Sequence, residues 1–87
     1  MAREHTRTYF LAKLARELEL RGFTAVLRAD PPSLRVGVPD TVLMSETVDC
    51  VPMPDGWCYR WSWGEVLLST SAPSEAADRI AHILRPS

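Results

Sequence analysis

The feature that most constrains the fold is a short segment in which every second residue is aromatic. It contains four of the chain's seven aromatic side chains, Trp57, Tyr59, Trp61 and Trp63. A period of two is typical of a β-strand, in which alternate side chains point to the same face of a sheet. Each aromatic side chain buries about 150–250 Å², so four together exceed the apolar patch that a soluble monomer usually exposes. We therefore expect either helices of this chain or another molecule to cover that face.

Two segments with helical spacing flank the part of the sequence that alternates. Apolar residues recur at this spacing between residues 3 and 21, and Gly22 directly afterwards favours a helix end. A second helix is expected to begin within residues 71–75, where a hydroxyl cap, an early proline and an acidic residue follow one another. Pro86 is expected to stop it.

Turn residues divide the central part into four expected strands, at residues 23–29, 34–38, 46–53 and 57–63. Residues 65–70 are ambiguous, because they can extend the fourth strand past a kink or form a short edge strand. The connections are short enough for an antiparallel meander, and two helices match the width of four strands. The sequence thus predicts a single α+β domain over residues 1–87. It is an open-faced sandwich of order α-β-β-β-β-α with both helices on one face.

The turn at Pro54-Asp55-Gly56 decides which side chains share the aromatic face. A two-residue turn at Asp55-Gly56 would pair Pro54 with Trp57 and require an amide hydrogen that proline lacks. A three-residue loop, with Pro54 at the first turn position and Gly56 in a bulge, avoids this conflict. The sequence therefore predicts that Met53 pairs with Trp57.

In this register neither sheet face is cleanly polar. The aromatic side chains lie beside Asp49 and Val51, and the opposite face carries Cys58, Arg60 and Ser62. We expect the helices on the aromatic face. The alternative, an aromatic face open for a partner, remains because Arg60 and Ser62 point the other way. In both cases a second surface with apolar character stays open, which predicts a homodimer formed through the sheet or its edge.

Residues that could carry chemistry lack the spacing that chemistry needs. Cys50 and Cys58 are diagonal neighbours in the expected register, about 7–8 Å apart, so we expect buried thiols rather than a disulfide. His5 and His82 could join them at a zinc ion, but no pair has ligand spacing. Ser62 has no nucleophile elbow or glycine-rich loop around it. We therefore expect no metal, no cofactor and no enzymatic activity.

The charge pattern indicates few electrostatic partners. The formal net charge is −1, which gives no long-range attraction to nucleic acid or to an anionic membrane. No apolar run approaches the roughly 18 residues of a membrane span, and none has the layout of a signal peptide. We therefore expect a cytoplasmic protein without membrane binding.

One stretch supports a resemblance. The segment Tyr59–Glu65, between a Pro-Asp-Gly turn and an alanine-rich final helix, resembles small uncharacterised actinobacterial proteins. Their pattern is a helix, an Asp-Pro-Pro hairpin, W-x-W-G-E and a second helix. No activity is assigned to that group, so the resemblance implies no functional residues. The layout is also loosely similar to secretion-chaperone-like sheets, which dimerise and hold partner segments.

We interpret the chain as a non-enzymatic protein-interaction or regulatory accessory module that dimerises through its sheet. The expected interaction residues are Trp57, Tyr59, Arg60, Trp61 and Trp63. Two alternatives remain open. One is a small-molecule pocket between the helices and the aromatic strand, walled by Trp61, Trp63 and Leu14, and the other is single-stranded nucleic acid stacked on an open aromatic face.

Overall fold

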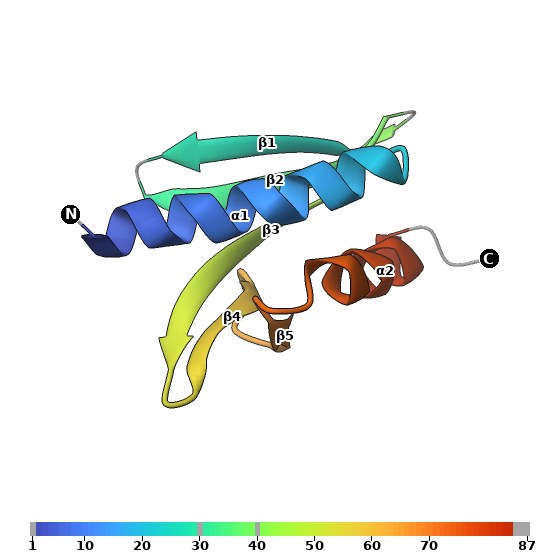
Figure 1. The fold of residues 1–87 in the computed structure, drawn as a ribbon. Coiled ribbons are helices and arrows are strands. Elements are labelled where there is room, and N and C mark those ends of the chain that lie inside the picture. Colours follow the sequence, from blue (N-terminus) through green and yellow to red (C-terminus); the bar gives the residue numbers. More distant parts are fainter. Residues whose placement is uncertain (1, 30, 40, 85–87) are drawn as a thin grey trace.

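Along the chain, one helix comes first, the strands of a five-stranded antiparallel sheet follow, and a second helix comes last (Figure 1). The computed structural model describes residues 2–29, 31–39 and 41–84, and the side chains of 6–29, 31–39 and 45–84. The helices are α1 (Ala2–Leu20) and α2 (Pro73–Leu84). The strands are β1 (Thr24–Ala29), β2 (Pro32–Val38), β3 (Thr41–Met53), β4 (Gly56–Trp61) and β5 (Val66–Ser69). The strands are neighbours in the order in which they occur in the sequence.

The α+β class and the antiparallel meander are therefore confirmed, but the prediction of four strands is wrong. The fourth strand ends at Trp61, where the Gly64 amide donates to the Trp61 carbonyl at 2.9 Å and closes a turn. The chain then returns alongside β4, and the Trp61 amide donates to the Glu65 carbonyl at 2.9 Å. The ambiguous segment after Gly64 thus forms a separate edge strand, and the order is α-β-β-β-β-β-α.

The end of α1 follows from a single glycine. Gly22 has φ +87°, in the left-handed region that glycine adopts without steric cost. The Phe23 amide donates to the Leu18 carbonyl at 3.1 Å, and the Gly22 amide donates to the Glu19 carbonyl at 3.0 Å. These two bonds form a Schellman motif, which satisfies carbonyls that a helix end leaves unpaired. The chain reverses here, so β1 can pack beneath α1.

At the start of α2 the predicted proline and acidic residue are present, but the predicted hydroxyl cap is not. Pro73 is the first helical residue and Glu75 lies in the first turn. The residue before the helix is Ala72, whose carbonyl accepts a hydrogen bond from the Ala76 amide at 3.0 Å. The Ser71 hydroxyl instead lies 2.9 Å from that of Ser69.

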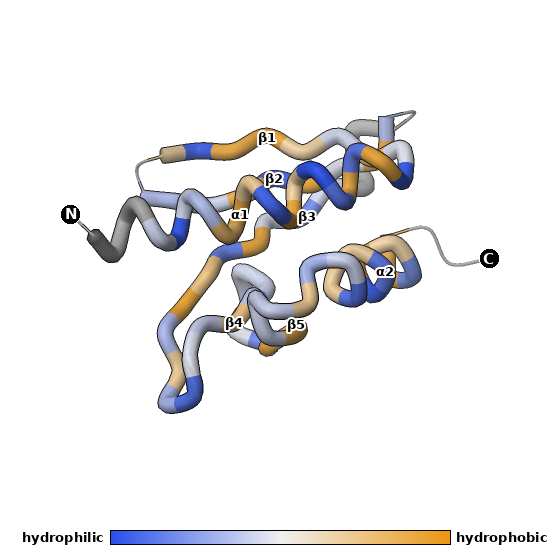
Figure 2. Tube along the Cα trace, in the orientation of Figure 1, coloured by the Kyte–Doolittle hydropathy of each residue, from blue (hydrophilic) through white to orange (hydrophobic). Residues whose placement is uncertain are grey.

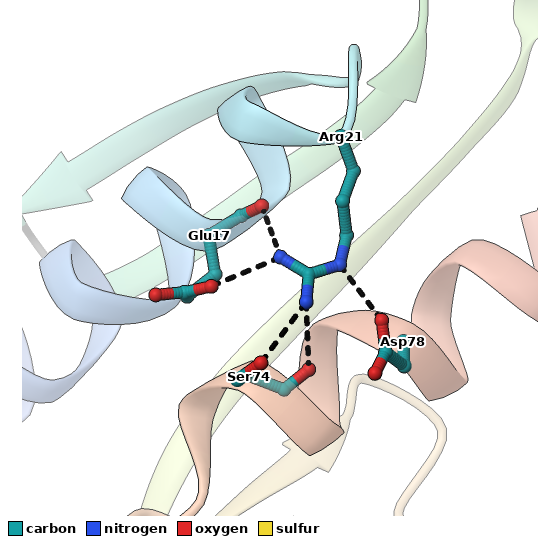
Figure 3. Close-up of polar contacts among 4 residues, drawn as sticks. All are labelled: Glu17, Arg21, Ser74 and Asp78. Atoms are coloured by element: carbon teal, nitrogen blue, oxygen red, sulfur yellow. Dashed lines mark hydrogen bonds and ion pairs between the residues drawn. The ribbon is translucent and has the colours of Figure 1, made fainter.

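Arg21 connects the two helices (Figure 3). Its Nη1 donates to the carboxylate and the backbone carbonyl of Glu17, one turn earlier in α1. Its Nε donates to the Asp78 carboxylate of α2 at 2.8 Å, and its Nη2 donates to the Ser74 hydroxyl at 3.0 Å. Both carboxylates raise the pKa of the guanidinium, with Asp78 contributing most. The start of α2 is thus held against the end of α1.

Both helices pack on the same face of the sheet, because their buried residues belong to one hydrophobic core. From the helices the core contains Leu11, Leu14, Leu18, Ala76, Ala77, Ile80 and Leu84. From the strands and the turn before β1 it contains Phe23, Leu34, Val36, Val48, Cys50, Tyr59, Trp61 and Leu67. The expected open-faced arrangement is therefore confirmed, and the aromatic face is the one that the helices cover.

The predicted register of the β3–β4 hairpin is wrong by one residue. Met53 pairs with Gly56, and Val48 with Trp61, so the loop contains only Pro54 and Asp55. Gly56 takes a positive φ of +136° within the pairing and inserts no extra residue. Burial explains this choice, because a one-residue shift turns every side chain of a strand to the other face. The predicted register would have placed the Asp49 carboxylate under the helices.

Candidate interaction surface

The structure separates the five predicted interaction residues into four environments. Tyr59 and Trp61 are buried in the core beneath the helices. The Tyr59 hydroxyl donates to the carbonyl of Phe10 in α1 at 2.7 Å, and burial raises the pKa of this phenol. These two rings fix α1 to the sheet and are not available to a partner.

Trp57 lies at the margin of the same core. Its ring centroid is 6.3 Å from that of Phe10, and the guanidinium carbon of Arg7 lies 5.8 Å from the centre of its ring. This distance is within the range of a cation–π interaction. The Arg7 Nε is buried and has no hydrogen-bond partner among the residues described. The Trp57 ring is thus half-buried between two α1 side chains and offers little free surface.

Trp63 lies beyond the end of β4, in the turn that leads to β5. Its ring stacks on that of Trp61, with centroids 4.7 Å apart and an interplanar angle of 8°. The residue is nevertheless 55% exposed. It is therefore the aromatic residue of the predicted set that a partner could reach.

Arg60 lies on the opposite face of the sheet, which the helices leave uncovered. We call this the helix-free face. Here Arg60 pairs with Asp49 of β3 through two hydrogen bonds, and the carboxylate raises the pKa of the guanidinium. The register places Val51 and Met53 of β3 on the same face, together with Val66 of β5 opposite Arg60.

The other half of the helix-free face contains a shallow cavity of about 300 Å³ over β1, β2 and β3. Val26 and Arg35 line it, and the Arg35 Nη2 donates to the Ser45 hydroxyl at 3.0 Å. Gly37 adds no side chain there, and its carbonyl accepts a hydrogen bond from the Thr24 hydroxyl at 3.2 Å. None of these residues is among the interaction residues expected from the sequence, although the alternation of Val26 and Arg28 with Ala25 and Leu27 indicated a second face of β1.

A second hollow lies on the outer surface of α2, where Glu75, Arg79 and His82 line it with Leu68 of β5. Neither hollow is lined by Trp61, Trp63 or Leu14. These two hollows therefore do not coincide with the small-molecule pocket suggested by the sequence.

Both cysteines are free and buried. Cys50 pairs with Tyr59 and faces the helices, whereas Cys58 pairs with Val51 and faces the other way. Burial is the main cause that raises the pKa of Cys50, to about 12, and burial also raises that of Cys58. A thiol of such high pKa is a poor nucleophile at neutral pH.

Within the described part of the chain, no group of three or more histidine, cysteine or acidic residues is arranged to hold a metal ion. The side chain of His5 lies outside that part. In the same ranges, neither helix combines the length and the hydropathy needed to cross a membrane.

We compared the chain with models of protein families, with curated proteins and with solved structures, and none of them matched.

Proposed function

We propose that the chain is a non-enzymatic protein-interaction module that self-associates through its sheet. The observation that carries this proposal is the placement of both helices on one face. This arrangement leaves the other face without cover, although it bears exposed apolar side chains, Val26, Met53 and Val66. An apolar side chain on an uncovered sheet gains free energy when a partner removes it from water.

The polar groups of the helix-free face also suit an interface. Arg35 is exposed, and Arg60 holds Asp49 in a fixed orientation. Protein interfaces that form and dissociate combine an apolar centre with a polar rim, and arginine is enriched in them. A regulatory accessory role in the cytoplasm belongs to the same proposal. The free thiols of Cys50 and Cys58 are compatible with a reducing compartment.

The alternative of single-stranded nucleic-acid binding has weaker support. Stacking of single-stranded nucleic acid needs exposed rings, but Tyr59 and Trp61 are buried under the helices. The third ring of the strand, Trp57, is flanked by Arg7 and Phe10. We therefore place the interaction on the opposite side of the sheet and at its edges.

Sedimentation equilibrium over a hundredfold range of concentration tests the proposal. We expect the mass to rise from the 9.8 kDa of the monomer toward twice that value. A protein that remains at the monomer mass at millimolar concentration would contradict self-association. An exposed position on α1, Ala12→Glu, provides a control whose added charge lies away from the sheet.

A further inference from the structure

We propose that β1 pairs antiparallel with β1 of a second copy and joins the two sheets into one of ten strands. This inference rests on the proposed self-association and specifies its partner, its strand and its register. In the register we infer, Leu27 lies opposite Leu27 of the second copy.

β1 is an outer strand of the sheet, with β2 on one side and, among the described residues, no strand on the other (Figure 1). An outer strand exposes a row of unpaired backbone groups that another strand can bind. Within the part of the chain that the structure describes, no backbone–backbone hydrogen bond outside the strand ladders reaches Ala25, Leu27 or Ala29.

The alternation of backbone hydrogen bonds across the sheet identifies which backbone groups of β1 point outward. The Ser62 amide donates to the Thr47 carbonyl at 2.9 Å, so odd-numbered residues of β3 bond to β4. In an antiparallel sheet these bonds alternate from side to side along a strand, and even-numbered residues of β3 therefore bond to β2. Leu34 pairs with Val48, so even-numbered residues of β2 bond to β3 and odd-numbered residues of β2 bond to β1. Arg35 in turn pairs with Val26 of β1.

The consequence is that even-numbered residues of β1 bond to β2 and odd-numbered residues point outward. The outward groups are those of Ala25, Leu27 and Ala29. Because these outward backbone groups occur at every second residue, they can form a regular antiparallel ladder with the outward groups of a second β1 strand.

β1 also lacks the devices by which outer strands usually prevent pairing. Its six residues include no proline, its pairing with β2 has no bulge, and its only charged side chain is Arg28. Val26 is 54% exposed on one face and Leu27 is 37% exposed on the other. Figure 2 shows the resulting hydrophobic stretch in the middle of β1.

The opposite edge of the sheet is a poorer partner. β5 has four residues, and its pairing with β4 is interrupted by a register shift between Tyr59 and Arg60. A short and irregular edge resists pairing with another strand. We therefore assign the association to β1.

Symmetry restricts the register. Two identical antiparallel strands are related by a two-fold axis perpendicular to the sheet, so one residue must lie opposite its own copy. Centring on Leu27 gives three hydrogen-bonded pairs, with Ala25 opposite Ala29 on both sides of the axis. Centring on Val26 gives only two such pairs within β1.

The side chains are also compatible with the register centred on Leu27. On the helix side two leucines meet at the axis between pairs of alanines. On the helix-free face Val26 lies opposite Arg28, and no two like charges lie directly opposite each other. The two Arg28 side chains are diagonal neighbours whose length allows both charged groups to reach water.

Two six-residue strands make a small interface by comparison with the roughly 1,200–2,000 Å² of stable complexes. We therefore expect a dimer that dissociates on dilution.

A cysteine at the axis tests the register. Directly opposite hydrogen-bonded residues have Cα atoms about 5.5 Å apart, within reach of a disulfide. We expect Leu27→Cys to form a covalent dimer under mild oxidation. The matched variant Val26→Cys should not, because residue 26 lies opposite residue 28 of the other copy. The wild type, with both native thiols buried, is the control for unrelated disulfides.

A proline at the same position tests the role of the backbone. Leu27→Pro removes an amide hydrogen that points outward, so it costs the dimer a bond and the β1–β2 ladder none. Leu27→Ala keeps the amide and removes the side chain. We expect the proline variant to sediment as a monomer and the alanine variant to retain concentration-dependent dimerisation. Tryptophan fluorescence verifies that each variant is folded.

The outcomes separate the two proposals. If the wild type dimerises but Leu27→Cys does not cross-link and Leu27→Pro still dimerises, the β1 edge is wrong and self-association stands. A monomeric wild type overturns both. Preferential cross-linking of Val26→Cys overturns the register centred on Leu27. If Leu27→Pro does not fold, the two cysteine variants decide.

Discussion

Asp49 and Arg60 lie directly opposite each other on β3 and β4, and two hydrogen bonds join their side chains on the helix-free face. The Arg60 Nε lies 3.2 Å from Asp49 Oδ1, and Nη2 lies 3.0 Å from Oδ2. This paired geometry matches the planar fork of a guanidinium to a carboxylate. It can form only in the observed register, which also places Val48 and Cys50 in the core. The ion pair and the hydrophobic core therefore favour the same alignment of the hairpin.

The contribution of this pair should be modest. Both side chains remain partly exposed to solvent, and pairs of this kind contribute about 0.2–1 kcal/mol. We expect a double-mutant cycle of Asp49→Ala and Arg60→Ala, measured by urea unfolding, to give a coupling energy in that range. A coupling energy of zero would show that the hydrophobic pattern alone sets the register.

Arg21 should contribute more, because one side chain bonds to three residues of two helices. We expect Arg21→Ala to lower the free energy of unfolding by about 1–2 kcal/mol, since several charge-assisted bonds are lost together. Arg21→Lys should recover less than half of this loss, because an ammonium group cannot reproduce the planar fork.

Asp78→Ala is the matched control for this clamp. The Asp78 side chain is 68% exposed, so the loss of its bond alone should cost less than about 1 kcal/mol. Thermal unfolding of Arg21→Ala, Arg21→Lys and Asp78→Ala measures how much stability each variant loses. Equal stability of Arg21→Ala and wild type would contradict a role of Arg21 in joining the helices.

Local signals in the sequence predicted the ends of the elements well. Gly22 ends α1 and Pro73 begins α2, because each residue restricts its own backbone regardless of the rest of the fold. The hairpin register was not predictable in this way. Both loops around Pro54 are compatible with turn preferences. The long-range partners distinguish them, because the observed register buries Val48 and Cys50 under the helices instead of Asp49.

The candidate site was predicted only in part for a similar reason. The aromatic alternation correctly indicated a large apolar face, but three of the four rings, Trp57, Tyr59 and Trp61, serve to hold the helices. Whether a strand lies at the edge of a sheet depends on strand order, which is a property of the whole chain. The residues of β1 therefore gave no local indication of a free edge.

The thiol of Cys50 should make stability depend on pH in the alkaline range. Burial raises its pKa to about 12 in the folded state, well above the ordinary value of a thiol, 9.0. The unfolded chain therefore releases this proton more readily. The corresponding stability is fully present below pH 9 and is lost as the pH rises toward 12. We expect the free energy of unfolding to fall above pH 9, and to fall less steeply in Cys50→Ala.

Labelling with a thiol reagent at neutral pH provides an independent measurement. In Cys58→Ala, which leaves Cys50 as the only thiol, the reaction should be slow and should follow the opening of the fold. Rapid labelling of the native protein would contradict the buried position of Cys50.

Trp63 should account for the part of the fluorescence that acrylamide quenches readily. It is the most exposed of the three tryptophans, whereas Trp61 is buried beneath it and Trp57 is half-buried. We expect Trp63→Phe to remove most of the accessible fraction, since phenylalanine keeps a ring against Trp61. If the accessible fraction persisted in this variant, Trp57 would be the exposed ring.

The same signal reports where the molecule associates. Trp63 follows β4, and two strands separate β4 from β1 in the sheet. Dimerisation through β1 should therefore leave the quenching of Trp63 unchanged as the concentration rises. Progressive protection of Trp63 along the sedimentation series would instead show that the turn after β4 takes part in the interface, and that the β1 edge is not the main contact.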